Sequence, residues 1–395
     1  MIIAVLVAIV YQKEWNLELH TTTFMAISLG CTVFCSVLVG VKKKNFSQSY
    51  PFIVISDRKI FLMLLFQLLT FYMTAKIKME QTGNSVLAEA VNETMMEAKF
   101  GESRYSLGFW GIPRAMIAEY GYLCCALIPL YIKNKVKGRT IKILVVSLIV
   151  NMVGSLLSGG RSELLCNIVC LAFFYFLFND VKHKLKPLII MGITALLFIS
   201  SFALLGNVIG RPENSEAPTL KEATYGFAVY CGAEIKNLDV ELSRPLKSQE
   251  PFGRLTLKPI YNWYGSHFND KALAAYSDGT YFNSEGKYVL GNVFTIFHSE
   301  YVDAGLFGIL LFTLLMSIVC RLFYVMTIKS NFPFLGIPNF ATIGCASMIP
   351  QVFLSFFGVS FWGWFGYWLS YKSLFIITLL FFFYGKNIIK YHKII

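Results

Sequence analysis

The sequence predicts an all-α, polytopic integral membrane protein with about ten transmembrane helices and one large extracytoplasmic loop. Of its 395 residues, 56% are hydrophobic and only 15% are charged, whereas a soluble domain carries roughly 25% charged residues. Continuous apolar runs recur along the chain at about the 20 residues that a helix needs to cross the hydrocarbon. Because the runs do not alternate in short segments, a closed β-barrel is excluded.

The apolar runs define the expected spans within a single membrane domain, residues 1–395. The first run, MIIAVLVAIVY, is too short for a normal span and lacks the basic n-region and the cleavage site of a signal peptide. Either the chain starts further upstream, or this helix crosses only in part. The ten expected spans are 1–11, 21–41, 59–76, 114–132, 141–157, 163–179, 187–206, 302–326, 337–357 and 368–385.

The net charge of +12 follows membrane topology and does not indicate a nucleic-acid partner. Lys and Arg gather in every second connection between the runs, which is the distribution of cytoplasmic loops and predicts that both termini are cytoplasmic. Three segments then fall on the outer side: a first loop at 77–110, the turn SGGRSE, and a long polar loop at 207–295.

Cysteine usage and motif content make metal or cofactor chemistry unexpected. Most of the nine cysteines lie inside apolar runs, so the sequence implies no disulfide framework. It contains no CxxC pair, HExxH motif or Walker-type loop, and no convincing cluster of metal ligands. We therefore expect no metal and no cofactor.

The first outer loop contains the pattern of an amphipathic helix. In NSVLAEAVNETMMEAKF, the apolar residues Leu87, Val91 and Met95 repeat at a spacing of four, and three glutamates repeat on another stripe. Ser85 is a suitable N-cap. Such a helix lies on the membrane surface or over the outer face of the protein, either as a packed structural lid or with a direct role for its glutamates.

The segment LLSGGRSELL places Arg161 between two apolar runs, at an outer corner. The glycines allow a tight turn, and the following helix points its N–H groups outward. With the guanidinium of Arg161 and the hydroxyl of Ser162, this corner is suited to bind phosphate. The alternative is a structural corner in which Glu163 pairs with Arg161.

Further arginines and many aromatic residues belong to the long outer loop. Arg211, Arg244 and Arg254 lie against the positive-inside trend. A single arginine at an outer span end is explained by a side chain that snorkels to the membrane interface. Several arginines together are better explained by binding of a polyanionic lipid headgroup. Aromatic side chains such as Tyr261 and Trp263 can stack on sugars or form the loop's own core. For the cluster near the last span we favour an interfacial belt, made of Trp362, Trp364, Tyr367 and Trp368.

Titratable groups gather where the chain enters the eighth span. The segment GNVFTIFHSEYVDAGLFG holds His298, Glu300 and Asp303, with Asn292 and Tyr301 beside them as candidates for substrate binding. Ionisable groups at membrane depth are costly and usually functional. A histidine near a carboxylate can deprotonate a sugar hydroxyl, a role that suits His298 better than His267. The alternative is polar groups in the first turns of a helix.

Four segments in this order resemble the bacterial oligosaccharide repeat-unit polymerases, the Wzy-type O-antigen and capsular polysaccharide polymerases. They are LLSGGRSELL, the arginine-led loop from GNVIGR, VYCGAEIKNLDVELSRPLKSQEPFGRLT and NVFTIFHSEYVDAGLFG, which together cover about residues 150–310. An Arg, ten residues, then Gly pattern fits Arg254 to Gly265. Asp303-Ala304-Gly305 departs from the aspartate–aromatic–glycine that is commoner in the family.

The resemblance implies a reaction outside the cytoplasm of a bacterial inner membrane, without nucleotide sugars or a required metal. A growing glycan is transferred from undecaprenyl diphosphate to a new lipid-linked repeat unit. The partners implied are undecaprenyl-diphosphate-linked oligosaccharides and the bilayer, with a chain-length regulator and a flippase. Developing charge on the leaving diphosphate needs fixed positive groups, for which Arg161 and Arg211 are the first candidates and Arg254 the third. His298 or Glu300 is the candidate general base.

Two other functions remain open at this point. An O-antigen ligase uses the same donor with a lipid A-core acceptor; its loss removes all surface O-antigen, whereas loss of the polymerase leaves single-unit caps. A lipid-linked oligosaccharide flippase or another transporter is expected to have internal repeats and charged, broken helices near mid-membrane. The sequence contains no such repeat, and its polar residues concentrate in one outer loop.

Overall fold

The computed structural model describes most of the chain, which is helical apart from one two-stranded sheet in the described part. Two compact units emerge, each made of three chain segments. Unit 1 contains 1–43, 219–325 and 351–371, and unit 2 contains 44–218, 326–350 and 372–395. The residues described are 1–39, 54–100, 105–158, 162–178, 220–244, 251–270, 283–285, 288–291, 294–328, 339–358 and 360–392.

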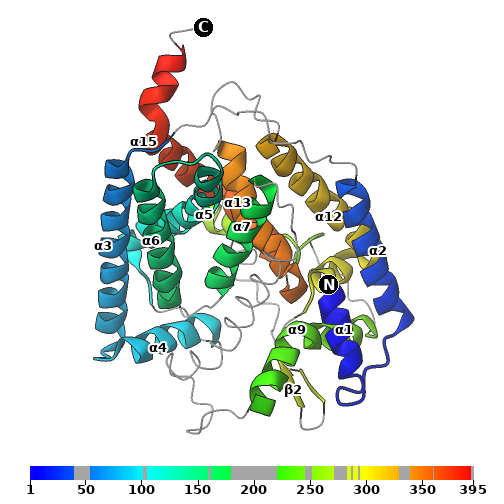
Figure 1. Ribbon diagram of the computed structural model, residues 1–395. Helices are drawn as coiled ribbons and strands as arrows, with labels where there is room; N and C mark the ends of the chain where they lie inside the picture. The colour runs from blue at the N-terminus through cyan, green and yellow to red at the C-terminus, as the bar shows by residue number, and fades with distance from the viewer. Residues whose placement is uncertain are drawn as a thin grey trace. The chain divides into compact units, whose positions relative to one another are not determined.

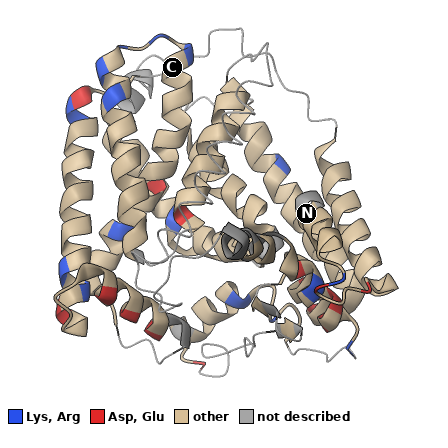
Figure 2. Ribbon diagram, turned by 60° about the horizontal axis from the view of Figure 1, so that its bottom comes forward, with Lys and Arg blue, Asp and Glu red and all other residues tan. Residues whose placement is uncertain are grey.

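Within the described residues, six helical segments are long and apolar enough to cross a membrane, so the all-α membrane class is supported. The strongest is Ile296–Ile328, with a mean hydropathy of 2.4. Figure 1 shows the helices that contain these segments, and Figure 2 shows that charged residues are sparse along them. The other five are Thr21–Leu38, Asp57–Thr82, Gly108–Lys133, Gly138–Ser155 and Ser360–Gly385.

Shorter helices occupy three further ranges in which the sequence predicts spans. They are α1 (Ile2–Val10), α7 (Ser162–Phe178) and α13 (Phe340–Phe353). The expected span at 187–206 lies outside the described residues. Each expected span within the described residues therefore contains a helix, although the structure also has helices in the range expected to be a loop.

In unit 2, α5 (Gly111–Lys133) packs against both α6 (Gly138–Ser155) and α7, and α6 also packs against α3 (Asp57–Thr82). Glycine brings two of these contacts close: a Cβ on Gly121 would lie 2.0 Å from Asn151, and a Cβ on Gly154 would lie 2.2 Å from Phe71. Small residues of this kind allow close helix packing within a membrane.

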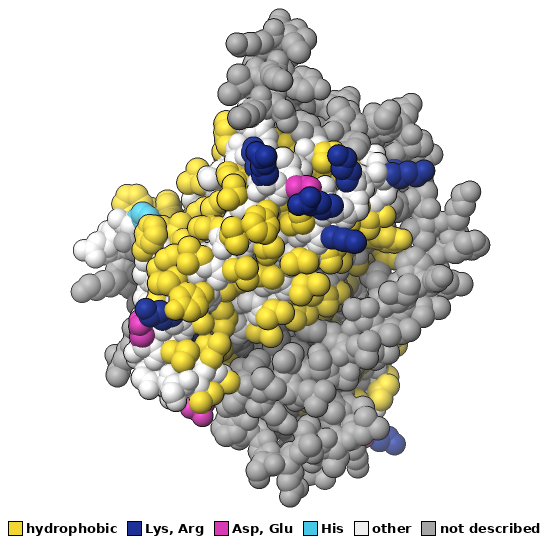
Figure 3. Space-filling view, turned by 60° about the vertical axis from the view of Figure 1, so that its left-hand side comes forward, with side chains coloured by type: hydrophobic (Ala, Val, Ile, Leu, Met, Phe, Trp, Pro, Cys, Tyr) yellow, Lys and Arg dark blue, Asp and Glu magenta, His cyan; other side chains and the backbone are white. Residues whose placement is uncertain are grey.

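The exposed side of α3 and α6 is apolar, as a lipid-facing surface requires. Figure 3 shows hydrophobic side chains in a broad band, with basic residues along one border. Burial of this band in hydrocarbon explains why so many large apolar side chains face outward. On these two helices they include Phe61, Leu62, Leu65, Leu68, Leu69, Tyr72, Val146, Ile149 and Val153.

The amphipathic helix predicted in the first outer loop is α4 (Leu87–Phe100), which packs against α3 (Figure 1). Val91 and Met95 are buried as expected, but Leu87 is exposed. The first turn is closed by a bond from the Ala90 N–H to the Val86 carbonyl. Ser85 therefore precedes the N-cap position, because the helix begins one residue later than the sequence pattern indicates.

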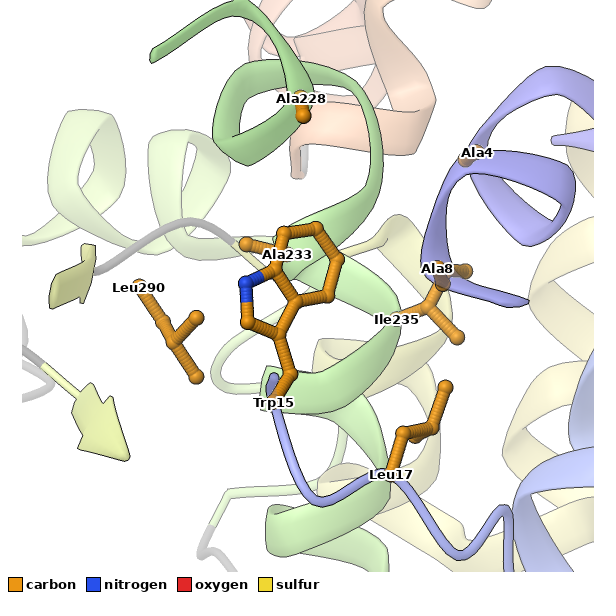
Figure 4. Packing of buried hydrophobic residues seen from close by; sticks show 8 residues of the cluster. All are labelled: Ala4, Ala8, Trp15, Leu17, Ala228, Ala233, Ile235 and Leu290. Atoms are coloured by element: carbon orange, nitrogen blue, oxygen red, sulfur yellow. The ribbon is translucent and has the colours of Figure 1, made fainter. Parts of the chain in front are cut away.

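Unit 1 is built around α9 (Leu220–Leu242), against which α1 and α2 (Thr21–Leu38) pack. Figure 4 shows Trp15 at the centre of the small core between these elements. The Trp15 indole is fully buried, stacks on Tyr11 at 5.1 Å and donates a hydrogen bond to the Tyr225 hydroxyl. The chain after α1 is thus fixed to α9 by an aromatic anchor.

The remaining elements of unit 1 include further parts of the long polar loop. They are α10 (Lys258–His267), the antiparallel strands β1 (Asn283–Glu285) and β2 (Tyr288–Gly291), most of α12 (Ile296–Ile328) and α14 (Ser360–Tyr367). Short 3₁₀ and π segments and α15 complete the described chain: η1 (Gly108–Trp110), η2 (Leu156–Ser158), η3 (Leu354–Phe357), η4 (Trp368–Lys372) and α15 (Ser373–His392).

The predicted aromatic belt is wrong for its three tryptophans. Trp362, Trp364 and Trp368 are buried, and only Tyr367 of the four is exposed. Phe323 of α12 meets Trp368 edge-on at 4.9 Å and Trp364 at 5.7 Å. The tryptophans, two on α14 and Trp368 at the start of η4, pack against aromatic rings of α12 within unit 1 and so form a buried aromatic core.

Candidate active site

The structure brings most of the predicted site residues into one unit. Arg161, Arg211 and Asn292 lie outside the described residues. Ser162 belongs to unit 2. The others all belong to unit 1: Arg244, Arg254, Tyr261, Trp263, His298, Glu300 and Tyr301.

A kink in α12 separates the start of this helix from its long apolar part. Ala304 and Gly305 have non-helical backbone angles, and Gly305 has φ +63°. A positive φ favours glycine. A Cβ on Gly308 would also lie 2.0 Å from the Glu300 carbonyl oxygen. The two glycines therefore permit the sharp bend after the short segment that bears His298, Glu300 and Asp303.

Asp303 holds the turn that carries Arg254. Its carboxylate accepts the N–H groups of Leu255 at 3.0 Å and Thr256 at 2.8 Å. Arg254 is 2% exposed and places its guanidinium over the Tyr261 ring at 5.4 Å. Hydrogen bonds from backbone N–H groups to a carboxylate are strong because the acceptor is charged. Asp303 thus positions Arg254, a role that the segment's spacing did not reveal.

Glu300 is fully buried at the kink. One carboxylate oxygen accepts a hydrogen bond from the Thr313 hydroxyl at 2.9 Å, and the other accepts one from the Trp362 indole at 3.3 Å. These two partners lie across the bend and on α14. Glu300 therefore stabilises the kink through its two hydrogen bonds. Of the two candidate bases, His298 is less buried than Glu300 and is the better candidate to accept a proton.

His298 lies beside an acidic residue that the sequence analysis did not select. Its Nε2 is 4.0 Å from Oε2 of Glu241, whose other oxygen lies 2.7 Å from Nη1 of Arg244. The imidazole also stacks on Phe294 with ring centroids 4.5 Å apart. The row Arg244–Glu241–His298 thus places an imidazole ring next to a carboxylate that is itself paired with an arginine.

The sequence predicts a polar loop where the structure has helix α9, which carries Glu241. The helix places Glu241 one turn before Arg244, and the two side chains pair. The same helix buries Asp239, which accepts hydrogen bonds from the His20 N–H at 2.8 Å and pairs with His20 Nδ1 at 2.9 Å. Its Lys236 donates to the Asn16 carbonyl at 2.7 Å. Helical spacing of apolar residues in AEIKNLDVEL was the available signal.

Exposed aromatic rings on α10 provide a surface for stacking. Trp263 and Tyr264 are about half exposed, and Phe268 is more so. His267 stacks on Trp263 at 4.5 Å and its Nδ1 lies 2.8 Å from the Trp263 carbonyl oxygen. The described contacts of the His267 ring are thus with Trp263, on the same helix. The open rings can contact the apolar faces of a sugar.

Glu163, at the start of α7, pairs with an arginine that the sequence analysis does not select. Ser162 is exposed at the start of α7, and Glu163 accepts a hydrogen bond from Nη2 of Arg114 on α5 at 3.0 Å. Glu163 therefore has a described partner 49 positions earlier in the chain. This pair joins the start of α7 to α5 within unit 2.

The described residues contain no group of three or more His, Cys, Asp or Glu side chains placed to hold a metal ion. The cysteines of α2, α5, α7, α12 and α13 are free thiols. In comparisons with known proteins, no family model matches the chain, and neither a curated protein nor a solved structure is similar to it.

Proposed function

We propose that the protein is an oligosaccharide repeat-unit polymerase, a glycosyltransferase of the bacterial inner membrane with ten spans and two cytoplasmic termini. It transfers a growing glycan from undecaprenyl diphosphate to a new lipid-linked repeat unit on the extracytoplasmic side. The observation that carries the proposal is the row Arg244–Glu241–His298. It joins two of the four segments on which the family resemblance rests.

The reaction needs a base for the acceptor and positive charge for the leaving group. The acceptor hydroxyl oxygen attacks the anomeric carbon of the donor sugar, and the bond from that carbon to the diphosphate oxygen breaks with its electron pair. His298 takes the hydroxyl proton, and Glu241 stabilises the resulting imidazolium. Arginines stabilise the departing lipid diphosphate; Arg254, which Asp303 positions, is the candidate in unit 1, while Arg161 and Arg211 stay the candidates that the family resemblance implies.

Stacking on α10 completes the proposed site. The half-exposed rings of Trp263 and Tyr264 bind sugar residues of the glycan, while the exposed Arg244 binds near the headgroup. Tyr301 contributes a contact at the entry of α12, and Ser162 and Asn292 stay substrate-binding candidates on the sequence alone. A diphosphate is a good leaving group, so the positive side chains matter to the rate at least as much as the base.

Purified protein incubated with a lipid-linked repeat unit tests the activity directly, because a polymerase produces a ladder of glycan lengths. We expect His298→Gln to lower ladder formation by about 10²-fold or more, as for loss of a general base. Glu14→Gln is the control variant, since Glu14 is an exposed residue of unit 1 with no part in the proposed site, and it should retain the ladder. Equal activity of the two variants would contradict the role of His298.

In cells, Arg161→Ala should abolish long-chain polymer while single repeat units still reach the surface. Arg161→Lys should also be impaired if bidentate phosphate contact is required. Normal chain length at normal protein level would exclude Arg161 from the site. Loss of every surface unit, including single-unit caps, would instead identify an O-antigen ligase.

A further inference from the structure

We propose that the start of α3, the end of α5 and the start of α6 together form a binding site for the headgroup of an anionic phospholipid. Exposed basic side chains gather at this corner of unit 2. They are Arg58, Lys135, Lys137, Arg139 and Lys142. The inference does not depend on the proposed glycosyl transfer, and none of these residues belongs to the predicted active site.

Two long-range hydrogen bonds hold these three helix ends together. The Tyr131 hydroxyl, in the last turn of α5, accepts the Ile55 N–H at 2.9 Å, just before α3 begins. Asp57, in the first turn of α3, accepts a hydrogen bond from the Thr140 hydroxyl of α6 at 2.7 Å. The bonds span 76 and 83 positions of the chain. The basic residues beside them are therefore neighbours in the fold.

Positive charge at this corner exceeds the negative charge. Within residues 54–60 and 133–142, the acidic side chain is Asp57, which is 34% exposed. Its Oδ2 lies 3.8 Å from Nε of Arg139, whose own side chain is 82% exposed. A guanidinium has five N–H donors, so Arg139 keeps donors that face outward. The corner is therefore a strongly positive surface with room for a further anion.

An apolar surface begins directly beside these cations. Phe61 follows Arg58 by one turn of α3, and Val146 follows Lys142 by one turn of α6; both apolar side chains are about half exposed. Figure 3 shows the basic side chains along one border of the hydrophobic band. A phospholipid joins an anionic phosphate to apolar chains, so its headgroup meets the cations while its chains cover the band. A free anion has no group that matches the band.

The predicted topology agrees with this partner. The connection between α5 and α6 is expected on the cytoplasmic side, where the membrane surface carries anionic lipids. Arg58 and Arg139 are the principal contacts, because a guanidinium can bind two phosphate oxygens at once.

Native mass spectrometry of the full-length protein in a neutral detergent tests the site, with phosphatidylglycerol or phosphatidylcholine added. We expect the lower Kd for phosphatidylglycerol. Arg58→Gln and Arg139→Gln should each raise this Kd by about fivefold, the effect of one basic residue at an anionic surface, and leave the Kd of phosphatidylcholine unchanged. Lys76→Gln is the matched control, because Lys76 is exposed toward the other end of α3 and pairs with Glu80.

Equal Kd values for the two lipids in the wild-type protein would overturn the proposal. Equal weakening by Lys76→Gln would also overturn it, because the effect would then be one of net charge. Glycerol phosphate carries the phosphate without acyl chains. If it binds as tightly as phosphatidylglycerol, the ligand is a free anion and the lipid site is contradicted.

Thermal unfolding separates loss of lipid binding from loss of folding. The replaced side chains are exposed, so each variant should keep the wild-type melting temperature. If Arg139→Gln lowers it through the contact with Asp57, Arg58→Gln decides the outcome, since that change leaves the Asp57 contact intact. A wild-type Kd for phosphatidylglycerol in folded Arg58→Gln would contradict the site.

Discussion

The buried acidic residues of unit 1 differ in their surroundings. Asp303 accepts two backbone N–H groups, and Glu300 accepts hydrogen bonds from a threonine and a tryptophan. Glu234 on α9 is 1% exposed, and neither of its carboxylate oxygens has a hydrogen-bond partner in the described part of the chain. Burial raises the pKa of Glu234 from its ordinary value of 4.5 to about 8.

This raised pKa predicts that Glu234 makes the protein less stable as the pH rises. The folded state holds the proton up to about pH 8, whereas the unfolded chain releases it near 4.5. Between these values the unfolded state binds fewer protons, so the free energy of unfolding falls with increasing pH. Glu234→Gln should remove this dependence. Thermal unfolding in detergent at pH 5 and at pH 8 measures it.

Glu14→Gln is the control for the pH experiment, because Glu14 is exposed in unit 1. Its melting temperature should change with pH as the wild-type value does. Parallel pH profiles for wild type and Glu234→Gln would show that this carboxyl is solvated in the folded protein.

At the scale of elements, α4 depends on a narrow apolar face. Val91 and Met95 are buried against the rest of unit 2, while Met96, next along the chain, is 46% exposed. An amphipathic helix is held by the stripe that it buries. The opposite face of α4 carries the exposed glutamates Glu89 and Glu93, which interact with water and do not pack against unit 2.

A charge on the buried stripe should therefore release α4. Val91→Asp is expected to destabilise its packing by about 2 to 4 kcal/mol, since an unpaired carboxylate would be buried. Met96→Asp places the same charge on the exposed face and should have little effect. Hydrogen exchange of backbone amides in α4 distinguishes the two, and equal protection in both variants would contradict the observed face.

At the scale of the whole molecule, hydrophobic surface and charge distribution together define a membrane protein. In the part of the chain that the structure describes, six helical segments have the length and hydropathy of a span. Large apolar side chains face outward on α3 and α6, and the basic residues lie at the border of this band (Figure 3). The side of the membrane on which each connection lies follows from the positive-inside rule and is a prediction.

Cysteine labelling of intact cells tests that topology. Ser85→Cys, in the exposed connection before α4, should react with a membrane-impermeant maleimide. Lys137→Cys, exposed between α5 and α6, should react only after the membrane is permeabilised. The parent chain supplies the background from native cysteines. The reverse labelling pattern would show that the protein has the opposite orientation in the membrane, with the proposed site on the cytoplasmic side.

Local sequence patterns were sufficient for the helices that bury one face or cross a membrane. The α4 stripe at Val91 and Met95 appears in the spacing of its apolar residues. The same method failed for α9, where Lys236, Asp239 and Glu241 make the segment look like a solvated loop. Burial of these charges is possible only because His20, Asn16 and other distant groups satisfy them.

The sequence alone determined that this is a helical membrane protein and where most of its helices lie, because run length and charge clustering are local properties of the chain. Only the tertiary structure decided which charged groups meet. Glu163 pairs with Arg114, and Glu241 lies beside His298, across separations that no local spacing encodes. The physical reason is that a buried charge needs a partner, and folding supplies it from another helix.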